Sequence, residues 1–169
     1  MMLVAIISLV FSCLIQGISS NYLGYIYSDL SLFSTIYILI NLLVLRPYFG
    51  SEKKYLIILG VFSFAMGIAY TDAVLLNVFL FFIIYYFSKM FHYYFPYNFF
   101  TLNISCLLGV FVYHIVTFFF LFILESDYYS INMLFSIVTH SILMTLGYTS
   151  LLYFIFKFLF SNLLLREIK

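Results

Sequence analysis

The sequence predicts an all-α integral membrane protein with six transmembrane helices and both termini in the cytoplasm. The first observation behind this prediction is the composition: of 169 residues, 66% are hydrophobic and only 8% are charged. A soluble domain is about half apolar and about a quarter charged. So few charged side chains cannot cover a globule of this size with polar surface, so lipid must solvate most of the chain.

The second observation is the length and spacing of the apolar segments, which predict a single transmembrane domain over residues 1–169. A helix needs about 20 residues to cross the bilayer core. We expect helices at approximately 2–19, 29–46, 55–71, 73–89, 102–124 and 131–157. Residues 2–19 are interpreted as a retained helix rather than a signal peptide, because they have no basic n-region and no A-x-A-like cleavage site.

The third and fourth helices come from one apolar stretch, residues 55–88, whose single charged residue is Asp72. As one helix this stretch would span about 50 Å, well beyond the ~30 Å hydrocarbon core. Two helices joined by a turn at residues 70–73 fit better, and they place Asp72 at or just under the membrane surface. Asp72 is then a turn residue; the alternative, a carboxylate buried among the helices, would mark a functional site.

The third observation is the sorting of charges. With six helices, successive connections alternate between the two sides of the membrane. All seven Lys and Arg residues then fall on one side, and Asp29, Asp72, Glu125 and Asp127 fall on the other. The positive-inside rule assigns the basic side to the cytoplasm. The basic residues are Arg46, Lys53, Lys54, Lys89, Lys157, Arg166 and Lys169.

Two histidines, His114 and His140, fall inside the fifth and sixth expected helices. A single histidine inside a membrane usually faces the bundle interior and hydrogen-bonds a neighbouring helix. A proton relay is the alternative, and a metal site would need a third ligand that no nearby carboxylate or thiol obviously supplies. We therefore interpret both histidines as structural polar groups.

Other polar and small residues in the expected helices predict helix–helix contacts. The amides are interpreted as hydrogen-bonding groups between helices or at the interface, and the small residues as sites of close helix approach. The amides are Gln16, Asn41, Asn77 and Asn132, and the small residues are Ser8, Ser12, Gly60, Ala65, Gly67 and Ala69.

No sequence pattern predicts catalysis. The chain contains no nucleophile elbow, no phosphate-cradling glycine loop and no H-E-x-x-H motif. Its two cysteines, Cys13 and Cys106, are too few for a disulfide framework or a zinc site. A net charge of +1 gives no basic field for nucleic acid. We expect a protein that is not an enzyme and has no cofactor.

In the stretch LGVFSFAMGIAYTDAVLLNVFLF at residues 59–81, a glycine-containing helix leads through an acid and a turn into an apolar helix. In this stretch and in the order of its segments, the chain resembles the family of the rod shape-determining protein MreD. The family commonly places an acid four residues after the glycine. That position is Thr71 here, and Asp72 follows it. Residues 14–19, 28–45, 112–122 and 139–160 are similar to the other helices of the family.

This resemblance implies a non-enzymatic, multi-pass component of the bacterial cell-elongation complex, located in the inner membrane and maintaining cell shape. The implied partners are the bitopic protein MreC, the peptidoglycan synthases of elongation, and the actin-like filament of MreB, contacted directly or indirectly. The candidates for partner contact or structural polar roles are Gly67, Thr71, Asp72, Asn77, His114 and His140.

Two other classes remain open. One is the substrate-binding subunit of an energy-coupling-factor vitamin transporter, which has a similar length and six helices. Such subunits are expected to carry two alanines four residues apart on the first helix, where this chain has Ala5 and Leu9. Their vitamin pocket would have to form around Tyr22, Tyr25 and Asp72. The other class is a structural membrane protein with neither role.

Overall fold

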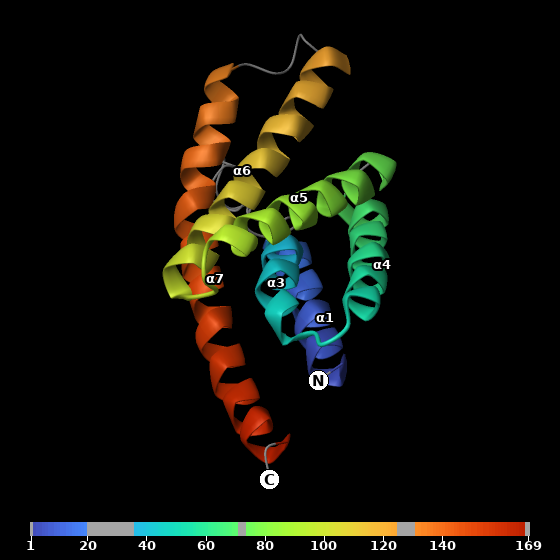
Figure 1. Cartoon of the computed structure of the whole chain (residues 1–169). Helices are drawn as coiled ribbons and strands as arrows, with labels where there is room; N and C mark the ends of the chain where they lie inside the picture. Colours follow the sequence, from blue (N-terminus) through green and yellow to red (C-terminus); the bar gives the residue numbers. More distant parts are fainter. Residues whose placement is uncertain (1, 20–35, 71–73, 125–130, 168–169) are drawn as a thin grey trace.

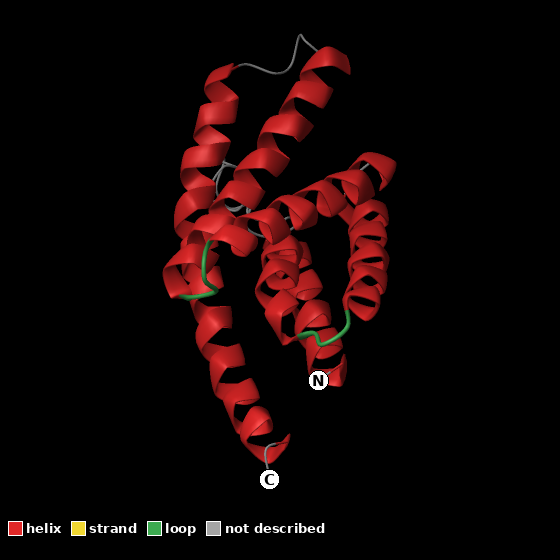
Figure 2. Cartoon of the chain, viewed as in Figure 1, coloured by secondary structure: helices red, strands yellow, loops and turns green. Residues whose placement is uncertain are grey.

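The structure is a computed structural model that describes residues 2–19, 36–70, 74–124 and 131–167 (Figure 1). These residues form helices and short connections, with no strand among them (Figure 2). The predicted all-helical class is confirmed. The helices are α1 (Met2–Ile18), α3 (Tyr37–Leu45), α4 (Glu52–Tyr70), α5 (Val74–Tyr94), α6 (Phe99–Leu124) and α7 (Ile131–Glu167), with a short 3-10 helix, η3 (Arg46–Tyr48).

Four of these helices are long and apolar enough to cross a membrane: α4, α5, Phe99–Phe120 within α6, and Leu134–Phe160 within α7. The chain is therefore a multi-pass membrane protein by the length and composition of its helices. Helix α1 and the α3–η3 unit are apolar but shorter. Residues 29–35 of the expected second helix lie outside the described residues, and Ile36 is not helical, so the described helix begins at Tyr37. Of the expected turn at residues 70–73, Tyr70 belongs to α4 and residues 71–73 lie outside the described residues.

Several helices extend beyond the predicted bounds. Helix α4 begins at Glu52 rather than 55, and α7 continues to Glu167 rather than 157. Helix α5 continues past Lys89 to Tyr94 and stops just before Phe95 and Pro96. Lysine does not end a helix at the membrane surface, because its long aliphatic stem carries the charge into water. Proline does, because it disfavours helical geometry in the residue before it.

A reciprocal cap sets the start of α6. The Thr101 N–H donates to Asn98 Oδ1 at 2.9 Å, and the Asn98 N–H donates to Thr101 Oγ1 at 3.1 Å. Each side chain thus satisfies a backbone donor that has no partner within the helix. The helix begins at Phe99 for this reason, before the apolar run that led to a predicted start at 102.

Successive described helices run in opposite directions. Glu52 at the start of α4 contacts Lys89 near the end of α5, whereas Asn77 near the start of α5 hydrogen-bonds Ser63 further along α4. The same reversal of order appears between α1 and α3, in the contacts Gln16–Tyr37 and Ser12–Asn41. It appears between α5 and α6, in Asn77–Tyr113 and Ser88–Ser105. It also appears between α6 and α7, in Phe99–Tyr153 and Asn103–Ser150. The start of α1 and the end of α7 consequently lie toward the same end of the bundle (Figure 1).

Helix α3 forms the centre of the bundle. All nine of its residues are buried, and it contacts α1, α4, α5, α6 and α7. A helix that is apolar on every side must be enclosed by other elements or by lipid, and α3 is enclosed by its neighbours. The single amide side chain in α3 is that of Asn41, which is fully buried.

The outer surface is strongly apolar. On α4, for example, Ile57, Val61, Phe64 and Ile68 recur at helical spacing and are each more than half exposed. Such a stripe is unusual on a soluble monomer. When the stripe faces hydrocarbon, its exposure costs no free energy, because lipid tails are as apolar as the side chains themselves.

Candidate functional site

A cleft of about 850 Å³ opens where η3, the start of α4 and the end of α5 meet. Its charged lining residues are Arg46, Glu52 and Lys89, and His92 also lines it. Tyrosines from α4, α5 and the connection at residues 95–98 make up much of the remaining wall.

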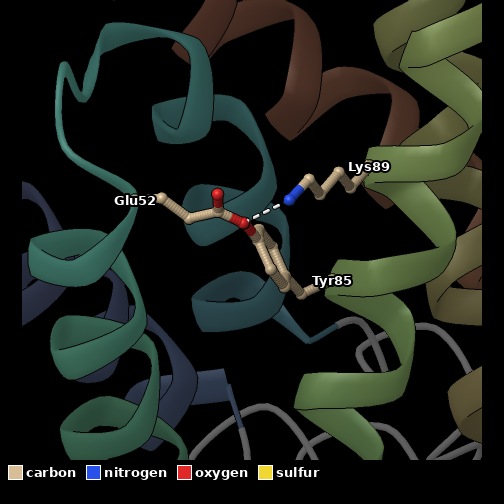
Figure 3. Close-up of polar contacts among 3 residues, drawn as sticks. All are labelled: Glu52, Tyr85 and Lys89. Atoms are coloured by element: carbon tan, nitrogen blue, oxygen red, sulfur yellow. Dashed lines mark hydrogen bonds and ion pairs between the residues drawn. The ribbon is translucent and has the colours of Figure 1, made fainter.

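Glu52 is the centre of the charged cluster (Figure 3). Its Oε1 accepts hydrogen bonds from Lys89 Nζ and, at 2.9 Å, from the Tyr85 hydroxyl. The Glu52–Lys89 ion pair is accessible to water, with side chains 51% and 42% exposed. The Arg46 guanidinium lies over the Tyr85 ring, 5.7 Å from its centroid. Tyr85 therefore orients both the carboxylate and the second cation.

Two tyrosines attach the cleft to the central helix. The Tyr55 hydroxyl donates to the Leu42 carbonyl at 2.8 Å, and the Tyr97 hydroxyl donates to the Val44 carbonyl at 3.0 Å. Both carbonyls belong to the last turn of α3, where carbonyl groups lose their intrahelical partners. Burial raises the pKa of Tyr97 well above its ordinary value, so its hydroxyl stays a neutral donor.

The residues of this cleft were not predicted as a site. Arg46 and Lys89 entered the sequence argument only as topology markers. The available signal is the spacing of Tyr85 and Lys89, which are four residues apart and so share one face of α5. Placing Glu52 opposite them also requires knowing which faces of the antiparallel helices α4 and α5 meet, and the sequence does not show this.

The predicted candidates lie elsewhere. Asn77 is buried between three helices: its Nδ2 donates to the Ser63 carbonyl on α4 at 3.3 Å, and its Oδ1 accepts from the Tyr113 hydroxyl on α6 at 2.8 Å. Gly67 is buried on α4, and a Cβ there would come within 3.0 Å of the Val74 Cα on α5. Both residues maintain close contact between α4 and α5, far along the hairpin from the cleft.

The remaining candidates are described only in part. His114 is partly buried on α6, next to Tyr113 with their ring centroids 6.0 Å apart. His140 lies on α7, and Thr71 and Asp72 fall outside the described residues. Among the side chains that are described, no three His, Cys, Asp or Glu residues gather in a metal-binding arrangement.

A second polar cluster joins α1, α3 and α7. Asn41 Nδ2 donates to the Ser8 carbonyl at 2.9 Å and to Ser12 Oγ at 2.5 Å. Ser12 Oγ also pairs with the Tyr148 hydroxyl at 2.8 Å. The sequence suggested hydrogen bonding for Asn41 and close packing for the two serines; it did not suggest Tyr148. This cluster is enclosed and has the character of internal hydrogen bonding between helices.

The comparisons with known proteins add no relative: the chain matches no protein-family model, no curated protein and no solved structure. What the arrangement can do follows from its chemistry. The buried side chains of Asn41, Asn77 and Ser12 hydrogen-bond between helices, whereas the cleft presents charged groups to its surroundings. The first set suits a scaffold, and the second suits binding.

Proposed function

We propose that this chain is a six-helix adaptor of the bacterial inner membrane that works without catalysis, by holding the transmembrane helices of partner proteins. Following its resemblance to the MreD family, we assign it to the cell-elongation complex. There it would link MreC and the peptidoglycan synthases to the actin-like filament and so help to maintain cell shape.

The observation that carries the membrane placement is the position of the basic residues. Alternating helix directions bring the η3–α4 connection, with Arg46, Lys53 and Lys54, to the same end as Lys89 on α5. Lys157 on α7 belongs to this end too, because the neighbouring Phe156 and Phe160 rings pack against Tyr48 of η3. The gathering of these cations at one end supports the proposal that six helices lie in the membrane. By the positive-inside rule, this end and both termini lie in the cytoplasm.

The adaptor role is supported by how the chain uses its polar groups. Asn41, Asn77 and Ser12 are consumed in hydrogen bonds between helices, while long apolar stripes face outward. Helices in lipid associate through packing and shared hydrogen bonds rather than through the hydrophobic effect. A body of this kind binds partner helices along its apolar faces and needs no soluble domain.

The assignment to cell elongation comes from the resemblance alone. Its most recognisable stretch is residues 59–81, whose described parts belong to α4 and α5, two antiparallel helices that approach closely at Gly67. We therefore propose that the α4–α5 hairpin is the part of the chain that contacts partner proteins in the cell-elongation complex.

The first helix argues against a transporter subunit. Ala5 and Leu9, which occupy the positions of the expected docking alanines, are 1% and 0% exposed. Residues buried in the core cannot receive a coupling subunit. Tyr22, Tyr25 and Asp72, around which a vitamin pocket would have to form, lie outside the described residues.

The test is crosslinking in native membranes followed by affinity purification of the tagged chain. Recovery of MreC, the elongation synthases or the actin-like filament is expected. Gly67→Ala, whose added methyl would lie 3.0 Å from the Val74 Cα, should reduce this recovery. Gly60→Ala, whose added methyl would lie 3.8 Å from Phe82, is the matched control and should retain it. Recovery of an ATPase pair with a coupling membrane subunit would instead establish the transporter class.

A further inference from the structure

The cleft has more positive than negative charge. Its charged lining is Arg46, Lys89 and Glu52, so a single carboxylate faces two cations. Glu52 is already bound by Lys89 and by the Tyr85 hydroxyl. Within the described part of the chain, Arg46 makes no ion pair. Arg46 is therefore the one cation of the cleft without a carboxylate partner among the described residues.

Arg46 is held in place without using its donors. Its guanidinium lies over the Tyr85 ring, and such stacking leaves the N–H groups able to donate in the guanidinium plane. That planar fork matches two oxygens of a phosphate or carboxylate. Lys89, 42% exposed, adds a second cation that can reach the same ligand.

The surroundings of the cleft favour a ligand that comes from the membrane. Tyr86, Tyr93, Tyr94 and Met90 line it from the last turns of α5, and each is more than half exposed. Tyrosines at the end of a membrane helix lie at the interface, with the ring near the acyl chains and the hydroxyl in water. The volume of about 850 Å³ is far more than a lone phosphate ion requires.

We propose that this cleft binds the phosphodiester headgroup of an anionic phospholipid. Arg46 would donate to the phosphate oxygens, Lys89 would add charge, and Met90 with the tyrosine rings would contact the glycerol and upper acyl region. Glu52, the one acidic residue among the lining side chains, is already bound by Lys89 and Tyr85, so no free carboxylate is left to pair with a choline or ethanolamine group. The proposal depends on the helices lying in a membrane and is independent of the role in cell elongation.

The test is native mass spectrometry of the full chain in detergent, titrated with phosphatidylglycerol or with phosphatidylcholine of identical acyl chains. Phosphatidylglycerol should bind more tightly. Arg46→Gln should weaken its binding roughly fivefold, the loss expected for one interfacial cation. Lys53→Gln is the matched control, because Lys53 is exposed on α4 and does not line the cleft; it should leave binding unchanged.

Glu52→Gln tests the same site in the opposite direction and guards against misfolding of the arginine variant. Removing the competing carboxylate frees Lys89, so phosphatidylglycerol should bind more tightly than to the wild-type chain. Equal binding of the two lipids, or equal loss in Arg46→Gln and Lys53→Gln, would overturn the proposal. Displacement of phosphatidylglycerol by inorganic phosphate at equal concentration would overturn the lipid assignment in favour of a free anion, and displacement by a glutamate-rich peptide would do so in favour of a protein partner.

Discussion

The Tyr113 hydroxyl on α6 donates a 2.8 Å hydrogen bond to the Oδ1 of Asn77 on α5. The Nδ2 of the same amide donates to the Ser63 carbonyl on α4, so one side chain joins three helices. Asn77 is 2% exposed and Tyr113 is 6% exposed, and no water reaches groups at this depth in a membrane to replace a lost partner. The contact therefore ties the α4–α5 hairpin to the rest of the bundle.

Replacing Asn77 with leucine should destabilise the protein. We expect Asn77→Leu to lower the free energy of unfolding by about 1 kcal/mol, in the range measured for hydrogen bonds between membrane helices. Thermal unfolding in detergent, followed by circular dichroism, measures the change. Asn132→Leu is the control, because Asn132 is exposed at the start of α7 and its loss should be nearly neutral. Equal melting temperatures for the two variants would contradict the bridging role.

A second prediction concerns two helical glycines with different surroundings. A Cβ at Gly109 would lie 2.9 Å from Ile84 Cγ2 and 3.1 Å from Leu43 Cδ1, whereas a Cβ at Gly147 would have no neighbour within 4 Å. Gly147→Ala should be neutral or stabilising, by up to about 1 kcal/mol from helix propensity. Gly109→Ala should be destabilising, because overpacking a core costs roughly 1–3 kcal/mol.

The melting temperatures of these two alanine variants, measured in the same detergent, test whether Gly109 is packed more closely than Gly147. Both substitutions add the same methyl group to the middle of a helix, so helix propensity cancels in the comparison. If Gly109→Ala were as stable as Gly147→Ala, α6 could not be packed against α5 and α3 as closely as described.

Much of the fold could be predicted because composition alone separates a membrane helix from a soluble one. The expected segments 55–71 and 73–89 appear as α4 and α5, and the amides Asn41 and Asn77 stand out because few polar groups occur in an apolar run. Their hydrogen bonds between helices are what such groups need in lipid.

The faces of the helices could not be predicted, because lipid and protein core are equally apolar. Helix α3 illustrates this: its residues are apolar all round apart from Asn41, and nothing in them indicates that all nine are buried. Long-range pairings were equally hidden. The contact between Glu52 and Lys89 and that between Ser12 and Tyr148 depend on which helices are neighbours, and so the cleft could not be recognised from spacing.

A third prediction separates buried from exposed tyrosine hydroxyls. Tyr55 donates to the Leu42 carbonyl from a fully buried position. The Tyr85 ring is buried too, but its hydroxyl bonds the half-exposed Glu52, which water can solvate instead. Tyr55→Phe should therefore cost about 1–2 kcal/mol of unfolding free energy and Tyr85→Phe less than half of that.

These two variants make a matched pair, since each removes one hydroxyl and keeps the ring. Urea or thermal unfolding in the same detergent compares them directly. A larger loss for Tyr85→Phe would mean that the Glu52 cluster, rather than the attachment of Tyr55 to α3, stabilises this end of the bundle.

A final prediction tests the proposed orientation. Gly50 lies in the connection before α4, where an added Cβ would have no neighbour within 4 Å, and Asn132 is exposed at the start of α7. Alternating helix directions put these residues at opposite ends of the bundle, with Gly50 at the basic end. In a background of Cys13→Ala and Cys106→Ala, Asn132→Cys should react with a membrane-impermeant maleimide in intact cells. Gly50→Cys should react only after permeabilisation, because the positive-inside rule assigns its end to the cytoplasm. The reverse pattern would invert the topology, and labelling of both cysteines in intact cells would contradict their placement on opposite sides of the membrane.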